Sequence, residues 1–497
     1  MQRFLLTISL LISACIVNAQ QYHFRHYQVE DGLSNNTSIC TLQDSKGFMW
    51  FGTKDGLNRF DGYTFKIYRN NQSDSSSIGN NSIWRLYEDA NGILWVGTER
   101  GLFAYDPKSE KFSLLPGCPR SEISGITSDK NGNLWFIAGF KLYQYNGLQK
   151  KLIIYNDIDY LHFCTTVSRT YDGQIWIGTI DGNIVKYNSI QNTFSAFSVF
   201  SHSKQSSSAW VEKIYDSGLG FLFIGTSNQG LKIFYLNKNS YEDLLLYNEG
   251  NTDIYVRDVI RRDKREYWIA TENGIYIYDL AKDGFIHLVK NPVNAYALSD
   301  NAVYAFTKDK DGGIWACTYF GGVNYYPRQK IEFEKFFYTP NENSLKGNAV
   351  REITQDNNGK IWIGTEDAGL SVYDPRSAAF TNYSPEDGHS NLAHTNIHGL
   401  LVDGDKLWIG TFEHGLDVMD IKTRKIIKHY SYGDGANDLK SNFIHSLYKT
   451  KAGLIFVGTS NGLYIYNNGK DNFIPLNFLP PNNFFLQLQK IQVVMFG

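Results

Sequence analysis

The sequence predicts an all-β fold, a seven-bladed β-propeller followed by an incomplete second propeller. Three observations predict it. A short apolar motif built around Trp-Ile-Gly-Thr recurs ten times within the 497 residues. Consecutive copies lie about 45 residues apart, which is the length of one four-stranded propeller blade. Aromatic residues make up 15% of the chain, and Gly occurs 44 times, as expected for β structure with many tight turns.

One large aromatic residue marks each copy of the motif. Eight of the ten copies have Trp at this position and two have Phe. The marked residues are Trp50, Trp95, Trp135, Trp176, Phe223, Trp268, Trp315, Trp362, Trp408 and Phe456. We expect the aromatic side chain to fill the wedge between neighbouring blades, and the Gly that follows it to give the backbone room there.

The eighth copy shows the order of elements that all copies share. Val350–Ile353 predicts a first strand, and Asp356–Gly359 a tight turn that Asp can cap and Gly can close. Ile361–Thr365 predicts a second strand that is apolar on both faces, as expected between two other blades. Gly369–Asp374 predicts the third strand and Phe380–Tyr383 the outer fourth strand.

The number of copies predicts how the rings close. The segment Phe24–Tyr27 resembles an outer strand without inner strands of its own. We expect it to complete the seventh blade, because a propeller must cover its free edges. Residues 20–330 are then the first propeller. The outer strand expected at Ile331–Phe337 would be free to begin a second ring.

Three copies remain for that second ring, in residues 331–478. Three blades leave open edges and one-sided apolar faces, so they are not expected to close. The segment 479–497 fits no strand-turn pattern and is interpreted as an aberrant or truncated tail. The sequence is therefore expected to derive from a longer protein, through a fragment end or a frameshift.

The first 19 residues predict export from the cytoplasm. Arg3 precedes the apolar run Phe4–Val17, and Ala19 offers a small residue for signal cleavage that would leave Gln20 first. An alternative is a lipoprotein box that anchors the chain through Cys15. No later segment is apolar enough to span a membrane, which predicts a periplasmic protein.

Charge and cysteine usage exclude several classes of partner. The net charge of −2 provides no basic footprint for nucleic acid. The four cysteines beyond the leader are widely scattered, which favours buried small apolar residues over disulfides, and no cofactor motif is found. Asp309–Gly312 resembles the start of a calcium loop, but an apolar strand follows at once, which favours a hairpin turn. The histidines His389, His394, His398 and His414 are spaced too irregularly to favour a metal site.

The full repeat, Asp-x-x-Gly-x-Leu/Ile-Trp-Ile-Gly-Thr-x-x-Gly-Leu-x-x-Tyr-Asp, resembles the two-component regulator propeller repeat over about Gln21 to Pro475. In that family, two seven-bladed propellers form the periplasmic sensor of hybrid histidine kinases of glycan-degrading bacteria. The resemblance implies an oligosaccharide or other small periplasmic ligand, pairing of two copies as in sensor kinases, and a kinase core after a membrane span. This chain shows no such span, no phospho-accepting His motif and no Gly-rich nucleotide boxes. We therefore expect it not to be an enzyme.

The predicted ligand site lies on one face of the propeller, around its central channel. Long polar loops reach this face at Asn70–Asn81, Asn291–Asn301, Tyr338–Asn348 and Ser384–Asn396. Sugar binding needs aromatic faces for stacking and planar hydrogen-bonding groups beside them. The candidates on inner strands are Trp84, Arg85, Arg257, Tyr304 and Arg351, and those on short turns are Lys54, Asp55, Glu99, Arg100, Tyr319 and Phe320.

Two other functions stay open at this point. Propellers also include glycosidases and polysaccharide lyases, but a sialidase-like enzyme would show Ser-x-Asp-x-Gly-x-Thr-Trp boxes, and the carboxylates here mostly occupy turn positions. A scaffold that only binds other proteins would show the same repeat. The sequence does not separate this alternative from a sensor.

Overall fold

The structure is a computed structural model, and it describes residues 22–155, 158, 161, 163–200, 209–328, 335–340, 343–388 and 390–476. The chain divides into two compact units, Met1–Lys330 (unit 1) and Ile331–Gly497 (unit 2). In the described residues, the regular structure consists of β-strands and two short 3-10 helices, η1 (Val29–Asp31) and η2 (Pro385–Asp387). The predicted all-β class is therefore confirmed. The predicted leader, 1–19, and tail, 479–497, lie outside the described residues.

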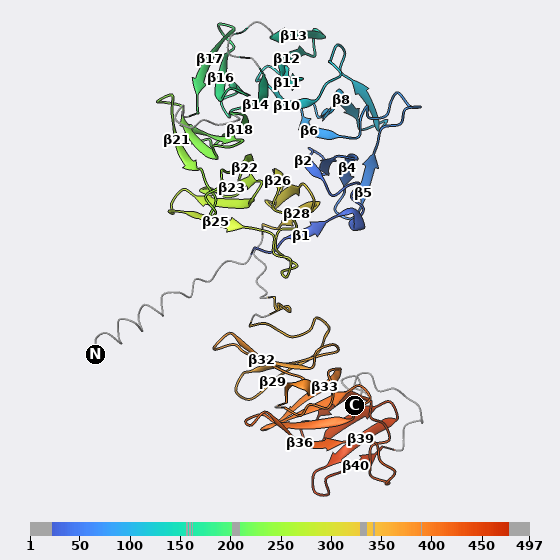
Figure 1. Cartoon of the computed structure of the whole chain (residues 1–497). Coiled ribbons are helices and arrows are strands. Elements are labelled where there is room, and N and C mark those ends of the chain that lie inside the picture. Colours follow the sequence, from blue (N-terminus) through green and yellow to red (C-terminus); the bar gives the residue numbers. More distant parts are fainter. Residues whose placement is uncertain are drawn as a thin grey trace, which may run out of the picture. The chain divides into compact units, whose positions relative to one another are not determined.

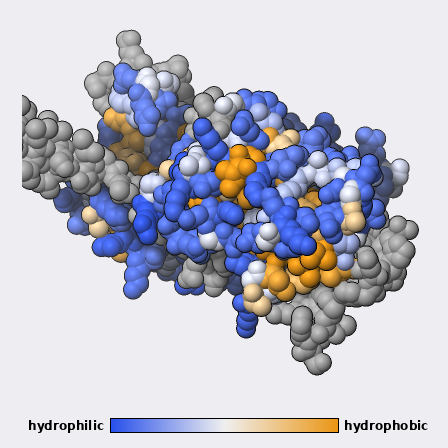
Figure 2. Space-filling model, turned by 90° about the horizontal axis from the view of Figure 1, so that it is seen from below, coloured by the Kyte–Doolittle hydropathy of each residue, from blue (hydrophilic) through white to orange (hydrophobic). Residues whose placement is uncertain are grey.

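Among the described residues, no helix is long and apolar enough to cross a membrane. Figure 2 shows one face of the molecule, which is mostly hydrophilic and is interrupted by several hydrophobic patches.

The described strands of unit 1 form seven antiparallel four-stranded sheets. The first three are β2 (Ser38–Gln43), β3 (Met49–Thr53), β4 (Gly56–Phe60), β5 (Phe65–Tyr68); β6 (Ile83–Glu88), β7 (Leu94–Thr98), β8 (Gly101–Asp106), β9 (Lys111–Leu114); and β10 (Ile123–Ser128), β11 (Leu134–Ala138), β12 (Lys141–Asn146), β13 (Lys151–Tyr155). The next three are β14 (Cys164–Arg169), β15 (Ile175–Thr179), β16 (Asn183–Asn188), β17 (Thr193–Ser198); β18 (Val211–Asp216), β19 (Phe221–Thr226), β20 (Leu231–Tyr235), β21 (Ser240–Leu245); and β22 (Val256–Arg261), β23 (Glu266–Thr271), β24 (Gly274–Asp279), β25 (Phe285–Leu288). The seventh is β26 (Val303–Lys308), β27 (Ile314–Thr318), β28 (Val323–Tyr326) and β1 (Arg25–Tyr27).

These seven sheets are the blades of a closed ring. Figure 1 shows them around a common centre, with the first strand of each blade innermost. Each innermost strand contacts the innermost strand of the next blade, and β26 of the last blade contacts β2 of the first. Because the contacts return to the first blade, every blade face in the ring has a neighbour.

The closing strand predicted at Phe24–Tyr27 is confirmed as β1. It pairs antiparallel with β28, with Arg25 opposite Tyr325 and Tyr27 opposite Val323. The Phe24 side chain is only 3% exposed and lies 6.1 Å from the Trp268 ring, measured between ring centroids. The N-terminal segment therefore covers the outer edge of the last blade, which would otherwise be free for pairing with another chain.

The motif Trp and Gly have the packing roles that the sequence predicts. Trp50 is 2% exposed and packs against the rings of Tyr68 in its own blade and Tyr105 in the next. A Cβ on Gly52 would lie 2.4 Å from the Cys40 sulfur and 2.7 Å from a methyl carbon of Ile83, both inside van der Waals contact. In the first blade only Gly therefore fits at this position, whereas the third, sixth and seventh blades have Ile137, Ala270 and Cys317 there.

The turn Asp has a second role that the repeat pattern did not reveal. In the third blade, one Asp129 oxygen accepts hydrogen bonds from the backbone N–H groups of Asn131 and Asn133, which closes the turn. The other oxygen accepts the Trp135 indole N–H at 3.0 Å. The same contact joins Trp50 to Asp44 and Trp362 to Asp356. In these blades the turn Asp thus satisfies the one polar atom of the buried Trp, whereas Trp268 donates to Glu266 and the Trp408 indole N–H has no partner among the described residues.

This contact predicts a large stability effect for Asp129→Ala. Trp135 is 0% exposed, so the substitution leaves a buried indole N–H without a partner and also removes the turn cap. We expect unfolding to become easier by about 2–3 kcal/mol. Chemical denaturation of the variant beside Asp61→Ala measures this. Asp61 caps an exposed turn through Tyr63 and Thr64 without contacting a Trp, so its loss should cost far less.

The four described cysteines, Cys40, Cys118, Cys164 and Cys317, are buried and free, as the sequence predicts. Burial raises the pKa of the Cys118 thiol to about 11 and that of Cys40 to about 12. They are therefore protonated at neutral pH and act as small apolar residues.

Unit 2 contains three four-stranded sheets in its described residues. They are β29 (Val350–Gln355), β30 (Ile361–Thr365), β31 (Leu370–Asp374), β32 (Ala379–Tyr383); β33 (Ile397–Asp403), β34 (Lys406–Thr411), β35 (Leu416–Asp420), β36 (Lys425–Tyr430); and β37 (Ile444–Lys449), β38 (Ile455–Thr459), β39 (Gly462–Asn467), β40 (Asn472–Pro475). Ile353 on β29 is 63% exposed, whereas Val259, at the same repeat position in the closed ring, is 2% exposed. The first blade of unit 2 therefore presents an open face.

The outer strand expected at Ile331–Phe337 is wrong in its described part. Residues 331–334 lie outside the described residues, and Lys335–Phe337 form no strand. Phe336 instead packs against Tyr373 and Phe380, with ring centroids 4.7 and 5.4 Å apart. The segment also cannot pair with β28, because β1 already occupies that edge.

A ligand-binding mouth built on repeated bulges

Every innermost strand carries a register shift at the same place near its start. The shifts fall between Val256 and Asp258 in the sixth blade, and between Val303 and Ala305 in the seventh. The ten residues in this bulge position are Ile39, Trp84, Ser124, Thr165, Glu212, Arg257, Tyr304, Arg351, His398 and His445. A bulge turns its side chain out of the regular pleat, which is why bulges are common beside functional sites. The repeat therefore presents one side chain of variable chemistry per blade.

Two further positions lie beside each bulge residue. One is the residue two places before the bulge, and the other is the residue after the motif Thr. A backbone hydrogen bond joins them, for example Glu272 N–H to the Tyr255 carbonyl at 3.2 Å and Tyr319 N–H to the Ala302 carbonyl at 3.0 Å. In unit 1 these three positions of the seven blades form what we call the mouth. In blade order, three residues to a blade, they are Thr37, Ile39, Lys54; Ser82, Trp84, Glu99; Glu122, Ser124, Gly139; Phe163, Thr165, Ile180; Trp210, Glu212, Ser227; Tyr255, Arg257, Glu272; and Ala302, Tyr304, Tyr319.

Arg257 is the centre of a polar network in the mouth. Its Nε and one terminal nitrogen donate to Glu272 Oε1 at 2.7 and 2.5 Å. The other terminal nitrogen donates to the Tyr255 hydroxyl at 2.9 Å. The Tyr255 hydroxyl donates to Glu212 at 2.5 Å, and the nearer Glu212 oxygen lies 3.9 Å from the guanidinium. Side chains from two neighbouring blades thus surround one cation.

Two tyrosine rings also enclose this guanidinium. Its central carbon lies 3.8 Å from the Tyr255 ring centroid and 4.4 Å from that of Tyr304. Arg257 also donates to the Tyr304 hydroxyl at 3.2 Å. Burial raises the pKa of the Tyr304 phenol to about 12, and burial likewise raises the pKa of Tyr255. Both phenols are therefore neutral at physiological pH and can donate or accept hydrogen bonds.

The network continues into the seventh and first blades. The Tyr304 and Tyr319 rings lie 5.3 Å apart, and Tyr319 makes an edge contact with Phe320 at 4.7 Å. The Lys54 ammonium lies 4.5 Å from the Tyr319 ring centroid and donates to its hydroxyl. Phe320 is 71% exposed, so this end of the network presents a free aromatic surface.

A second aromatic group belongs to the third, fourth and fifth blades. Phe140 lies 6.1 Å from Phe163 and 5.9 Å from Trp210, in edge-on contacts. Phe140 is 40% exposed and Phe163 59% exposed. Both have left-handed backbones, with φ of 64° and 54°, which is strained for a residue with a bulky side chain. Two strained, exposed Phe residues in contact are more typical of a recognition surface than of a packed core.

The remaining mouth charges lie around Trp84. Arg85 donates to the backbone carbonyls of Ser124 and Trp84, each at 2.8 Å. Burial raises the pKa of Glu122, with a further contribution from Glu99 and an opposing one from Arg85. Within the described residues, the buried indole N–H of Trp84 has no hydrogen-bond partner. A polar ligand atom could satisfy it.

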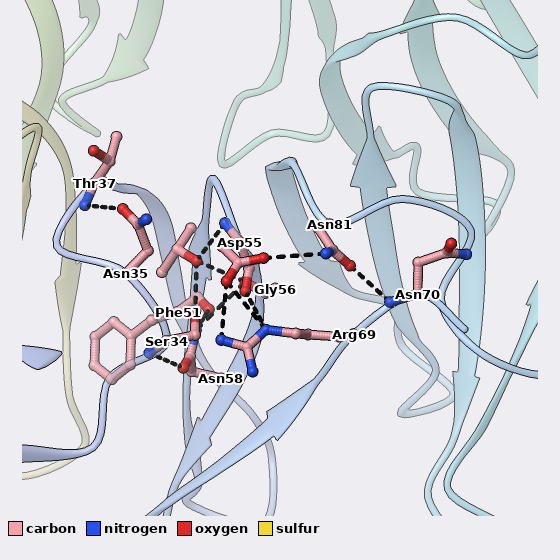
Figure 3. A network of polar contacts seen from close by, with 11 residues as sticks. Ser34, Asn35, Thr37, Phe51, Asp55, Gly56, Asn58, Arg69, Asn70 and Asn81 are labelled. Atoms are coloured by element: carbon pink, nitrogen blue, oxygen red, sulfur yellow. Dashed lines mark hydrogen bonds and ion pairs between the residues drawn. The ribbon is translucent and has the colours of Figure 1, made fainter. Parts of the chain in front are cut away.

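Asp55 makes structural contacts within the protein. It pairs with Arg69 at 2.9 Å and accepts a hydrogen bond from Asn81 at 3.1 Å. Asn81 also accepts the Asn70 backbone N–H at 2.7 Å, as Figure 3 shows, so it fastens the loop that leads into the second blade. Asn301 and Asn442 accept the equivalent bonds in their own blades. A hydrogen bond therefore joins the two ends of each of these loops.

The structure brings some predicted site residues together and separates others. Arg257, Tyr304, Lys54, Tyr319 and Phe320 form one connected group. Arg85 is joined to Trp84 through the Trp84 carbonyl, and Glu99 and Arg100 are exposed on the turn that follows β7. Arg351 belongs to unit 2, where it pairs with Glu366 at 2.8 Å.

Sequence reasoning missed Glu212, Tyr255 and Glu272, and the group of Phe140, Phe163 and Trp210. A signal for them existed, because a bulge residue stands eleven places before the motif Trp or Phe in nine of the ten copies. In the ninth copy the spacing is ten, since its turn is one residue shorter.

Four histidines of unit 2 lie in two pairs. His394 stacks on His414 with ring centroids 4.1 Å apart, and the ring centroids of His398 and His445 are 6.5 Å apart. His445 was not among the histidines that the sequence analysis named. His389 lies outside the described residues. Among the described residues, no group of three His, Cys, Asp or Glu side chains could hold a metal ion.

Comparison with known proteins adds the following. A family model described as two component regulator propeller matches residues 32–55, 77–100, 297–320 and 344–367. A curated protein named histidine kinase P4, from Formosa agariphila, is 56% identical over 55 residues, which are 11% of this chain and 4% of that protein. The match thus spans a small part of that relative.

Two solved structures share the fold. Both are extracellular domains of hybrid two-component systems of B. thetaiotaomicron. One has 23% identity and a TM-score of 0.59, over 93% of this chain and 74% of that one. The other has 19% identity and a TM-score of 0.54, over 92% of this chain and 67% of that one.

Proposed function

We propose that this chain, which carries two-component regulator propeller repeats, is the exported ligand-sensing region of a two-component signalling system and binds an oligosaccharide in the mouth of unit 1. The observation that carries the proposal is the mouth itself. One repeated bulge position presents seven different side chains on a rigid ring, and recognition sites are commonly built this way, with variable groups on a fixed scaffold.

The chemistry of the mouth suits a sugar. Phe163, Trp210 and Phe320 offer aromatic faces on which the apolar face of a pyranose can stack. Tyr255, Tyr304 and the two carboxylates beside Arg257 offer donors and acceptors for hydroxyl groups. All described elements are propeller strands and short 3-10 helices. We therefore propose recognition, and not phosphoryl transfer, as the role of the described residues.

The proposed organisation follows from this role. Residues 1–19 would direct export to the periplasm, residues 20–330 would hold the ligand, and residues 331–478 would be blades of a second propeller before the tail at 479–497. Two copies would pair, as expected for a sensor that signals through a dimer. Analytical ultracentrifugation with and without ligand tests the pairing.

Titration calorimetry of the purified chain against a panel of oligosaccharides tests the proposal. We expect one class of oligosaccharide to bind, and mass spectrometry of the same mixtures to show intact sugar. Bond cleavage would contradict sensing and favour the alternative of a propeller glycosidase or lyase. Absence of binding across the panel would contradict the oligosaccharide assignment.

The aromatic group predicts a specific loss of affinity for Phe163→Ala. Phe163 is more than half exposed, so its removal should leave the melting temperature nearly unchanged while it removes a stacking face. We expect affinity to fall about tenfold. Tyr63→Ala, which removes a 91% exposed ring away from the mouth, is the control and should keep full affinity.

A further inference from the structure

The charge of the mouth restricts the ligand further than the fold does. The mouth positions contain two cations, Lys54 and Arg257, and four carboxylates, on Glu99, Glu122, Glu212 and Glu272. Arg85, next to the bulge residue Trp84, adds a third cation, so the formal net charge is −1. All seven belong to one ring. An anionic ligand that enters this ring therefore meets a repulsive field, whereas an uncharged ligand does not.

Arg257 is also prevented from binding an anion directly. Proteins commonly bind carboxylate and sulfate groups through the paired N–H donors of an Arg fork. Here the Arg257 Nε and one terminal nitrogen both donate to Glu272, and the remaining nitrogen donates to Tyr255. With Glu212 3.9 Å away, the guanidinium has two carboxylate neighbours. The fork is occupied on the side that would bind an anion.

Lys54 does not compensate for this. Its ammonium lies on the Tyr319 ring and donates to the Tyr319 hydroxyl, in an exposed part of the mouth. An exposed ammonium is strongly hydrated and screened by salt, so one such group contributes little affinity.

We propose that the mouth of unit 1 selects an uncharged, hydroxylated ligand, a neutral oligosaccharide, over uronic-acid or sulfated oligosaccharides, because Glu212 and Glu272 neutralise Arg257, and Glu272 and Tyr255 occupy its donors. The inference rests on the proposed function and adds the class of sugar. In this arrangement the carboxylates and the neutral phenols accept hydrogen bonds from sugar hydroxyls, and Phe163 and Trp210 contact the sugar face.

The test removes the charge of one side chain and measures whether the preference between neutral and anionic sugars changes. Glu272→Gln keeps the shape of the side chain, removes its charge and weakens its hold on the Arg257 fork. We expect the unchanged protein to bind neutral oligosaccharides, such as hexasaccharides of xylan or mannan, at least tenfold more tightly than oligogalacturonate of the same length. In Glu272→Gln, the affinity for oligogalacturonate should rise about tenfold and should fall again with added salt.

Unit 2 offers a matched control for this substitution. Arg351 and Glu366 occupy the same two repeat positions as Arg257 and Glu272, and they form the same ion pair at 2.8 Å. Glu366→Gln removes that pair outside the mouth, so it should leave the sugar preference unchanged. Glu212→Gln is a second, independent variant if Glu272→Gln lowers the melting temperature strongly.

The outcomes separate the inference from the proposed function. Oligogalacturonate binding to the unchanged protein as tightly as the neutral sugars overturns the neutral selectivity but leaves oligosaccharide sensing intact. A shift caused equally by Glu366→Gln also overturns it. If neither class of sugar binds at millimolar concentration, both the selectivity and the proposed function are wrong.

Discussion

A chain without residues 22–28 should lose the stability of its first propeller. These residues supply β1 and the Tyr22 and Phe24 side chains, which are 9% and 3% exposed and lie against Trp268 and Tyr326. Their removal exposes this apolar surface and the edge of β28, and substituting one buried Phe by Ala alone costs about 3–5 kcal/mol. We expect the melting temperature of unit 1 to fall by more than about 10 °C.

Thermolysin digestion followed by mass spectrometry checks this result. Cleavage should begin in β26, β27 and β28, the blade that β1 completes. Phe24→Ala should show a smaller effect in the same place. Arg25→Ala changes an exposed side chain of the same strand and should behave like the unchanged protein. If the shortened chain is as resistant as the full chain, the ring does not depend on its closing strand.

Arg257→Ala should have the largest effect on ligand affinity, a fall of about 30-fold. Arg257 holds Tyr255, Tyr304 and Glu272 in one arrangement through hydrogen bonds of 2.5 to 3.2 Å. Without it, the Glu212 and Glu272 carboxylates lose the cation that they share and must rearrange or take up water. The groups that contact the sugar would then lose their positions.

Calorimetry of Arg257→Ala and Arg257→Lys measures this effect. Lysine keeps the charge but cannot reproduce the fork, so we expect only partial recovery of affinity. Arg59→Ala is the control, because Arg59 is also ion-paired, to Glu110 at 3.4 Å, but lies on β4 outside the mouth. An affinity for sugar that does not change in Arg257→Ala would contradict the place of this network in binding.

Much of the fold could be predicted because each blade is specified by local sequence. The turn Asp, the turn Gly and the apolar second strand lie within about 12 residues of one another, so their pattern is readable in one copy and repeated in ten. The closing strand was predictable for a related reason. Phe24–Tyr27 has the pattern of an outer strand but precedes every inner strand, and a closed ring has only one place for it.

The error at Ile331–Phe337 shows where such reasoning fails. The pattern of this segment is that of a strand, but strand formation also requires a free sheet edge. Whether the edge of β28 is free depends on β1, which precedes every other strand in the chain and is far from this segment in sequence. Pattern alone contains no information about that competition.

By itself the sequence determined the repeat, the class of fold, the order of strands in each blade and the segment that closes the ring, since all of these follow from residues close together in the chain. Only the tertiary structure decided which variable side chains meet. Arg257 and Tyr304 are 47 residues apart, and Lys54 and Tyr319 are 265 apart. They become neighbours because ring closure places the same bulge of successive blades side by side, and that arrangement turns separate side chains into one mouth.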